Sequence, residues 1–336
     1  MSFTRLSFDV TNVCNLNCAH CLRLDREEVS HLPMEIFEKA LNQSQRYGTK
    51  VVIFTGGEPF LHPQLTDMVD MLVKAGVKYY IVTNGIRTDK VAKLMENEGR
   101  RKHLMSISIS LEGSTEEIND RIRGKGVYRK VMATTAYLKS RGIPFGYKLS
   151  VNKFNVNDLE KFTLDAVKLG VDYVEFSHIH PTPGLIEHGL MLPRARWNEV
   201  TGEILRLSKI VKLNIVHCAG AYSPWSFYQC ASMQMTDIHI DCRGNLCVCC
   251  ILPYYTSGDE EKDKLVLAGN LAEMDLWDAH KRLVAIIARL NQSKIRKIAE
   301  GTFSESDHYP CIYCLKYFDK LNWIKELDPG NEWIKD

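Results

Sequence analysis

The chain has 336 residues, a length that predicts one large domain and a smaller one. Its 43 basic and 41 acidic residues give a net charge of +2, so neither a nucleic acid nor an anionic membrane is an expected partner. The sequence contains no apolar run long enough to span a membrane and no signal peptide. Its 11 cysteines are many for a reducing compartment unless they bind metal, and as disulfides they would leave one unpaired. We therefore expect a cytoplasmic, oxygen-sensitive protein.

Strand-like and helix-like segments alternate along the first half of the chain. Short apolar runs predict strands at residues 5–10, 51–54, 79–82, 105–111, 146–151 and 173–176. Amphipathic segments predict helices at residues 34–47, 66–74, 90–98, 158–169 and 194–212. Repeated β-then-α units favour an α/β fold with a parallel sheet, and periodicity alone allows either a barrel or a doubly wound sheet.

The most informative motif follows the first predicted strand. Cys14, Cys18 and Cys21 are spaced C-x3-C-x2-C, and the next cysteine in the chain is Cys218. Three thiolates suit a four-iron cluster whose fourth iron is left open to bind another group. A structural zinc site is the alternative, but zinc usually takes a second pair of ligands close by, and none follows here.

A second motif ends the second predicted strand, where residues 51–54 lead into Thr-Gly-Gly-Glu-Pro. The glycine pair, Gly56 and Gly57, lets the backbone approach a ligand closely, and Glu58 places an acidic side chain beside it. Polar segments also follow the next two strands, at residues 83–85 and 108–113. In a parallel sheet all of these segments lie at the carboxyl ends of the strands, where such folds place their active sites.

These motifs, in this order, resemble the radical S-adenosylmethionine (radical SAM) superfamily from about residue 3 to about residue 177. The resemblance implies a partial (β/α)6 TIM-like barrel, open on one side, in place of a doubly wound sheet. It implies that Cys14, Cys18 and Cys21 hold a [4Fe–4S] cluster whose open iron binds S-adenosylmethionine (SAM). An electron donor such as flavodoxin or ferredoxin would reduce this cluster.

The same resemblance assigns residues to the parts of SAM. In chain order they are His20 beside the adenine, Gly56, Gly57 and Glu58 around the methionine amino group, Asn84 near the adenosine, Ser110 near the ribose or the carboxylate, and Arg123 near the methionine carboxylate. Arg121 and Arg129 are equal alternatives to Arg123. Asn84 also has a purely structural interpretation, as a turn former.

Eight further cysteines follow the predicted barrel, and four of them resemble the Twitch/SPASM auxiliary-cluster domain of radical SAM enzymes. By that resemblance Cys230, Cys249, Cys311 and Cys314 hold one auxiliary [4Fe–4S] cluster, with structural zinc as the alternative. Residues 241–245 predict a hairpin turn before a strand that carries Cys249. No cysteine follows Cys314, which favours the shorter Twitch form with a single auxiliary cluster.

The expected domains are a radical SAM core, residues 1–213, and a small α+β iron–sulfur domain, residues 214–336. Four cysteines remain, and their number would allow a second auxiliary cluster. They are Cys218, Cys242, Cys247 and Cys250. Neighbouring residues of a strand point to opposite faces, so we expect only Cys249 of the 249–250 pair to bind the cluster.

Radical chemistry is what the resemblance implies for the reaction. Cleavage of SAM gives a 5′-deoxyadenosyl radical, which removes a hydrogen atom from a carbon of the substrate. We expect a radical SAM oxidoreductase or isomerase that acts on a peptide or a natural product. In the leading hypothesis Cys250 donates a hydrogen atom to the substrate radical, and the product is an epimer. Cysteine is also tolerated as a small core residue, and the other three surplus thiols are rivals for this role.

Other reactions stay open. In a dehydrogenase of a sugar or aminocyclitol alcohol, the auxiliary cluster would accept an electron, and His178, His180 or His217 would be the base. Peptide crosslinking or thioether formation is a third hypothesis. The 13 residues before Cys14 predict no leader-peptide-binding domain, which weakens the case for peptide substrates. A non-catalytic iron–sulfur redox protein is the remote alternative, and it would have no use for the Gly-Gly-Glu-Pro segment.

Overall fold

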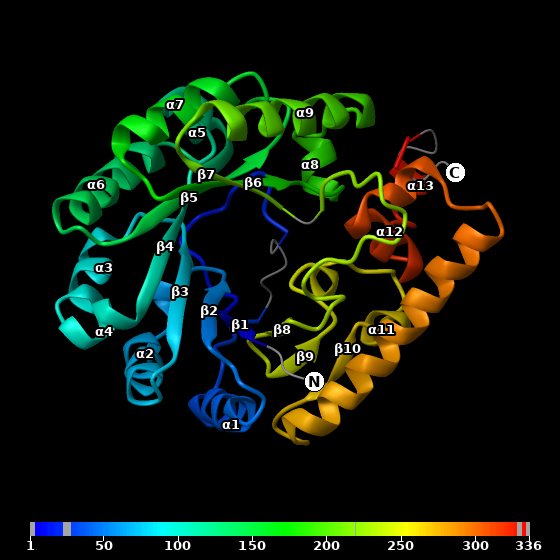
Figure 1. Cartoon of the computed structure of the whole chain (residues 1–336), viewed down its shortest axis with the longest axis horizontal. Helices are drawn as coiled ribbons and strands as arrows, with labels where there is room; N and C mark the ends of the chain where they lie inside the picture. The colour runs from blue at the N-terminus through cyan, green and yellow to red at the C-terminus, as the bar shows by residue number, and fades with distance from the viewer. Residues whose placement is uncertain (1–3, 23–27, 219, 328–330, 334–336) are drawn as a thin grey trace.

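The structure is a computed structural model of the chain, and it describes residues 4–22, 28–218, 220–327 and 331–333. Within these residues the strands form one ten-stranded sheet in the order β10-β9-β8-β1-β2-β3-β4-β5-β6-β7. Neighbours from β8 through β1 to β7 pair in parallel, whereas β9 pairs antiparallel with both β8 and β10. Figure 1 shows this sheet as a curved wall with helices along its outer side.

The strands are β1 (Arg5–Thr11), β2 (Val51–Gly56), β3 (Lys78–Thr83), β4 (Leu104–Ser110), β5 (Phe145–Val151), β6 (Tyr173–His178), β7 (Asn214–His217), β8 (Asp237–Ile240), β9 (Asn245–Cys247) and β10 (Leu267–Asn270). The helices are α1 (Met34–Gln45), α2 (Leu65–Lys74), α3 (Thr88–Met95), α4 (Glu98–His103), α5 (Glu116–Arg123), α6 (Val127–Ser140), α7 (Leu159–Leu169), α8 (Pro183–Glu187), α9 (Arg194–Ile210), α10 (Glu260–Lys264), α11 (Leu276–Ala299), α12 (Pro310–Tyr317) and α13 (Ile324–Leu327).

The six predicted strands correspond to β1 to β6, so the predicted α/β class with an open, barrel-like parallel sheet is confirmed. The alternation of side chains along β1 explains why this sheet has a polar interior. Phe8 points outward and packs edge-on against Phe37 of α1, with 5.1 Å between ring centroids. Asp9 points inward and accepts a hydrogen bond from His239 of β8 at 3.1 Å. Period-two alternation therefore directs polar side chains into the barrel.

The predicted helix over 90–98 is two helices, α3 and α4. Asn97 stands in extended backbone between them, and its side chain accepts a hydrogen bond from the Arg100 amide at 3.0 Å, which starts α4. Helix α5 begins in the same way at Thr115, whose side chain accepts from the Ile118 amide. No helix in the described residues has the length and apolar character needed to cross a membrane.

The C-terminal strands are joined to the barrel through β8, which pairs with β1. Figure 1 shows α11 and α12 on the side of the interior opposite β4 and β5. Helix α11 also packs against α1, where Trp277 stacks on Tyr47 at 5.5 Å between centroids. The predicted hairpin turn at 241–245 is present, but β9 ends at Cys247. Cys249 and Cys250 therefore lie beyond the strand, and the expected period-two alternation does not apply to them.

Candidate active site

The loop with the first three cysteines follows β1 and rests on the end of β2. The Gly57 amide donates to the Thr11 carbonyl at 2.6 Å, and the Glu58 amide donates to the Val13 carbonyl at 2.8 Å. A Cβ on Gly57 would stand 2.2 Å from the Val13 oxygen, and one on Gly56 would stand 2.4 Å from the Thr11 oxygen. The glycine pair is therefore required by the close approach of the two backbones that hold the cysteine loop.

Cys14, Cys18 and Cys21 lie close enough to influence one another electrostatically. Burial raises the pKa of the Cys18 thiol to about 11, the Cys21 and Cys14 thiols add to this shift, and Arg123 opposes it. No three His, Cys, Asp or Glu side chains in the described ranges lie close enough to hold a single metal ion. Each thiolate of a [4Fe–4S] cluster binds a different iron, so its ligands need not converge on one point.

Glu58 is fully buried and links the ends of β2 and β3. Its Oε1 accepts from the Thr83 hydroxyl at 2.8 Å, and its Oε2 accepts from the Asn84 amide at 2.7 Å. Burial raises the pKa of this carboxyl, and these hydrogen bonds oppose the shift. The Asn84 side chain in turn donates to Asn15 Oδ1 at 2.7 Å and lies 3.8 Å from Cys14 Sγ. Glu58 and Asn84 therefore connect the cysteine loop to two strand ends.

Glu112, to which the sequence analysis gave no role, brings together two of the predicted SAM residues. Its Oε1 lies 3.2 Å from Arg123 Nη1 and 3.5 Å from His20 Nε2, and its Oε2 accepts from the Ser150 amide at 2.7 Å. Burial lowers the pKa of His20. Glu112 lies just beyond the end of β4, as Glu58 lies just beyond the end of β2. An acidic residue at the carboxyl end of a strand was the signal in the sequence that could have identified Glu112.

Two polar atoms of the side chains around Glu112 are buried and have no hydrogen-bond partner. They are Arg123 Nε and His20 Nδ1. A buried donor without a partner costs free energy, so these atoms fit a ligand with an acceptor beside the cysteine loop. The alternatives to Arg123 are engaged elsewhere. Arg121 stacks over the Phe154 ring at 3.4 Å, and Arg129 is exposed and paired with Glu116. The residues present therefore fit a SAM carboxylate at Arg123.

Ser110 ends β4 and pairs in register with Lys148 of β5, which pairs with Glu175 of β6. Lys148 Nζ lies 2.7 Å from Glu175 Oε1, and the two side chains are 34% and 24% exposed. Burial would lower the pKa of Lys148, but Glu175 holds it above its usual value. Tyr147, next along β5, packs outward on Phe162 of α7, so this ion pair faces the barrel interior.

Cys250 lies near this ion pair. The Lys148 ammonium interacts electrostatically with the thiols of Cys218 and Cys250, and Cys250 is exposed. The predicted histidine bases are less accessible. His178 is buried 3.6 Å from the Trp197 ring, burial lowers its pKa well below the usual value, and burial lowers the pKa of His180 to about 4. Burial also lowers the pKa of His217.

The four thiols expected to hold the auxiliary cluster come together from three separate segments. Burial raises the pKa of Cys311 well above its usual value, and the neighbouring Cys230, Cys314, Cys249 and Cys218 thiols add to the shift. Burial and Cys230 likewise raise the pKa of Cys314 to about 12. Burial raises the pKa of the Cys242 and Cys247 thiols, and the Asp241 and Asp9 carboxylates add to both shifts.

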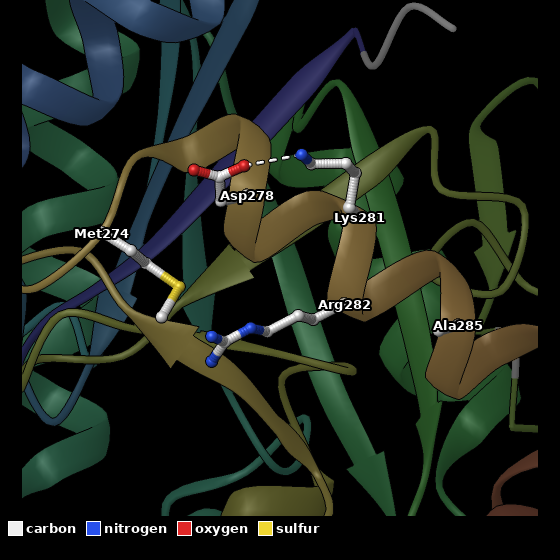
Figure 2. Close-up of a pocket in the computed structure, with 5 residues that line it drawn as sticks. All are labelled: Met274, Asp278, Lys281, Arg282 and Ala285. Atoms are coloured by element: carbon white, nitrogen blue, oxygen red, sulfur yellow. Dashed lines mark ion pairs between the residues drawn. The ribbon is translucent and has the colours of Figure 1, made fainter.

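Two hollows of the described part of the chain differ in their relation to the cysteine loop. One, of about 460 Å³, adjoins the cysteine loop at Asn17 and Ala19 and is lined by Arg121 and Phe154. The other, of about 500 Å³, lies at the start of α11 between Met274 and Ala285. Figure 2 shows its Asp278–Lys281 ion pair beside Arg282. None of the residues that line the second hollow belongs to either cysteine group.

Comparison with known proteins agrees with this geometry. Residues 8–174 match the model of the Radical SAM superfamily. Fe-coproporphyrin III synthase of Methanosarcina barkeri is 30% identical over 156 residues, which are 45% of this chain and 38% of that protein. PqqA peptide cyclase of Ruegeria pomeroyi is 30% identical over 172 residues, which are 50% of this chain and 45% of that protein. The chain thus spans less than half the length of these two relatives.

Solved structures share the fold. Streptococcus suis SuiB bound to S-adenosylmethionine superimposes with a TM-score of 0.67 at 18% identity, over 82% of this chain and 65% of that one. SuiB bound to its precursor peptide SuiA gives a TM-score of 0.60 at 16% identity, over 75% and 61%. By the match over residues 8–174, the chain belongs to the Radical SAM superfamily, a family that uses a [4Fe–4S] cluster and SAM.

Proposed function

We propose that this enzyme modifies a peptide or a peptide-derived natural product and inverts one of its stereocentres. The bound cofactors supply the 5′-deoxyadenosyl radical that removes a hydrogen atom from the substrate carbon. Cys250 then donates the hydrogen atom of its thiol to the opposite face of that carbon and becomes a thiyl radical. One electron from the electron donor and one proton from solvent restore the thiol. The observation that supports this proposal is that the Cys250 thiol is exposed and interacts electrostatically with the Lys148 ammonium.

Two relatives support a peptide substrate. PqqA peptide cyclase acts on a peptide by its name, and SuiB has been solved with the precursor peptide SuiA. The Lys148–Glu175 pair is suited to bind a peptide group, because the ammonium donates to a carbonyl oxygen and the carboxylate accepts from an amide. Its exposure to the interior leaves both groups available to such a substrate.

The cofactor sites are part of the proposal. Cys14, Cys18 and Cys21 hold the SAM cluster, while Cys230, Cys249, Cys311 and Cys314 hold one auxiliary [4Fe–4S] cluster in a Twitch-type domain. Arg123 and His20 receive polar groups of SAM through the buried atoms that lack partners. Gly56, Gly57 and Glu58 line the methionine amino group of SAM, Asn84 lies near its adenosine, and Ser110 lies near its ribose or its carboxylate. The domain division at residues 213 and 214 and the electron donor, a flavodoxin or ferredoxin, belong to the same proposal.

A second candidate is oxidation of an alcohol carbon, with the auxiliary cluster as electron acceptor. One observation favours this candidate. The Glu175 carboxylate is open to the interior and could accept a hydroxyl proton, whereas His178 and His180 are buried and could not. Its interaction with Lys148 holds the pKa of Glu175 below the usual value despite burial, so the carboxylate is ionised.

The test is an anaerobic assay in deuterated water with SAM, dithionite and a peptide-containing cell extract, read by mass spectrometry. One deuteron gained per product supports epimerisation, whereas a product lighter by two hydrogens supports oxidation. The Cys250→Ala variant should still form 5′-deoxyadenosine but should lose the deuterated product. Cys242→Ala, which removes a buried thiol, is the matched control and should keep full turnover. Full turnover of Cys250→Ala would exclude it as the donor.

A further inference from the structure

Lys294 is a buried lysine on α11. Its ammonium lies close to the cysteines that we propose as ligands of the auxiliary cluster, Cys230, Cys249, Cys311 and Cys314. Its side chain is only 6% exposed. Its Nζ donates to the Tyr228 carbonyl at 3.2 Å, two residues before Cys230. It also lies 5.3 Å from the centroid of the Tyr313 ring, next to Cys314, and 5.6 Å from that of Phe303. The ammonium is thus held in a fixed place among backbone and rings.

This charge has no carboxylate to neutralise it. Over the residues for which the structure gives positions, no Asp or Glu forms an ion pair with Lys294. Asp307, the carboxylate that influences it, is already bridged by Lys297 at 2.7 Å and Lys316 at 3.2 Å. The remaining groups that influence Lys294 are the Cys314 and Cys230 thiols.

A buried charge without a counter-charge is costly, so the environment of Lys294 calls for an anion. Neutral thiols do not supply one. A cluster held by four thiolates does, because its net charge is negative, and Lys294 stands beside two of the four ligands.

We propose that Lys294 is the counter-charge of the auxiliary cluster and raises its reduction potential. This inference rests on the auxiliary cluster of the proposed function. Reduction adds an electron to an already anionic cluster, so a fixed cation in a low-dielectric site stabilises the reduced form more than the oxidised form. Lys294 is a positioning residue in this role, because it acts through the cluster and not on the substrate.

The experiment measures the auxiliary cluster alone in the full-length chain. Replacing Cys14, Cys18 and Cys21 by Ala removes the signal of the other cluster, and the protein is then loaded anaerobically with iron and sulfide. Metal content is determined first, and the potential is then measured by a redox titration followed by electron paramagnetic resonance. The variants are Lys294→Met, Lys294→Gln and Lys294→Arg. Lys281→Met, which removes an exposed lysine of the same helix, is the matched control.

We expect Lys294→Met and Lys294→Gln to lower the equilibrium constant for reduction at least tenfold, which is 59 mV for a one-electron couple. Lys294→Arg and Lys281→Met should change the equilibrium constant for reduction by less than tenfold. Gln can still donate to the Tyr228 carbonyl, so a shared effect of Met and Gln isolates the charge. If Met and Gln lose iron while Arg retains it, the counter-charge is likewise supported.

An unchanged potential in iron-loaded Lys294→Gln would overturn the inference, as would loss of iron from all three variants, which would make the lysine a packing residue. Zinc in place of iron in the parent protein would overturn the auxiliary cluster itself. Metal content reveals that failure before any potential is measured, so it is distinguishable from a failure of the role of Lys294.

Discussion

Arg123 and Glu112 form an ion pair, with 3.2 Å between Nη1 and Oε1, in which the side chains are 5% and 1% exposed. The pair fixes the guanidinium, yet Arg123 Nε lacks a partner. Glu112 is itself fixed by the Ser150 amide, so the strand ends of β4 and β5 determine where the arginine points. A buried arginine held in this way is prepared to bind an anionic group, since half of its fork is still open.

Arg123→Met is therefore expected to weaken SAM binding by about 10- to 100-fold, because a hydrogen bond to a charged group contributes about 1.5–3 kcal/mol. Equilibrium dialysis of SAM with the cluster-loaded protein measures this. Arg129→Met removes an exposed arginine paired with Glu116 and should leave the Kd unchanged. Equal affinities for the two variants would exclude Arg123 as the SAM contact.

The first cluster is tested by replacing its ligands together. Cys14→Ala, Cys18→Ala and Cys21→Ala in one chain should abolish 5′-deoxyadenosine formation and reduce iron from about eight to about four atoms per chain, if each cluster holds four. Iron and sulfide analysis with a SAM-cleavage assay checks both results. Cleavage that survives in this variant would contradict the assignment of the three cysteines.

Gly57→Ala is expected to displace the cysteine loop, because its Cβ would stand 2.2 Å from the Val13 carbonyl oxygen and backbone must move to admit it. We expect loss of iron from the first cluster while the second is kept, measured as iron per chain. Gly202→Ala is the matched control, since a Cβ at Gly202 meets nothing within 4 Å and the residue lies inside α9. Its iron content should equal that of the parent, and an equal content in Gly57→Ala would disprove the steric argument.

Hydrophobic periodicity was enough to predict β1 to β6, because each buries alternate or continuous apolar residues against helices. It did not predict the break between α3 and α4, which depends on the single cap at Asn97. The family resemblance made the cysteines and Arg123 candidates, but it gave no role to Glu112 or Lys294. Their importance depends on contacts with residues distant in sequence, such as Ser150 and Tyr228, and no local pattern encodes such contacts.

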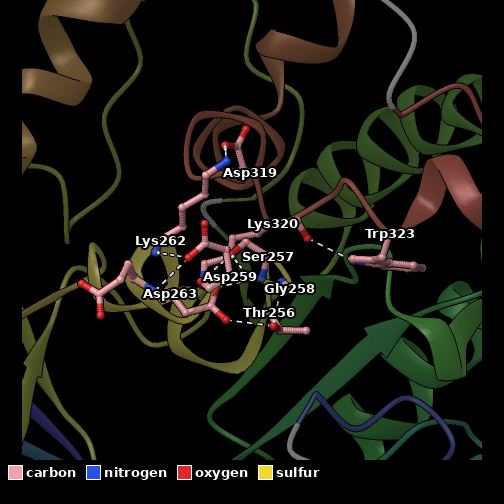
Figure 3. Close-up of polar contacts among 10 residues, drawn as sticks. Thr256, Ser257, Gly258, Asp259, Lys262, Asp263, Asp319, Lys320 and Trp323 are labelled. Carbon is pink, nitrogen blue, oxygen red and sulfur yellow. Dashed lines mark hydrogen bonds and ion pairs between the residues drawn. The ribbon is translucent and has the colours of Figure 1, made fainter.

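Asp263 and Lys320 provide a test of the C-terminal packing by pH. Figure 3 shows Asp263 with Thr256, Ser257 and Lys320. Burial alone would raise the pKa of Asp263, but the hydrogen bonds from Lys320, from Ser257 and from Thr256 lower it to about 2. Lys320 is 1% exposed and Asp263 is 29% exposed, so the pair is only partly shielded from solvent.

The lowered pKa of Asp263 determines how the free energy of unfolding changes with pH. An unfolded Asp titrates near 3.9, so the folded state binds fewer protons between that pH and about 2. The stabilisation is present above about pH 4 and is lost as the pH falls toward 2. In urea unfolding between pH 5 and 2, the double variant Asp263→Asn with Lys320→Met should therefore lose less stability than the parent. Asp319→Asn breaks the exposed pair with Lys262, 47% and 44% exposed, and should follow the parent curve because such pairs contribute little. Parallel curves for the parent and the double variant would mean that Asp263 titrates in the folded protein as it does in the unfolded chain.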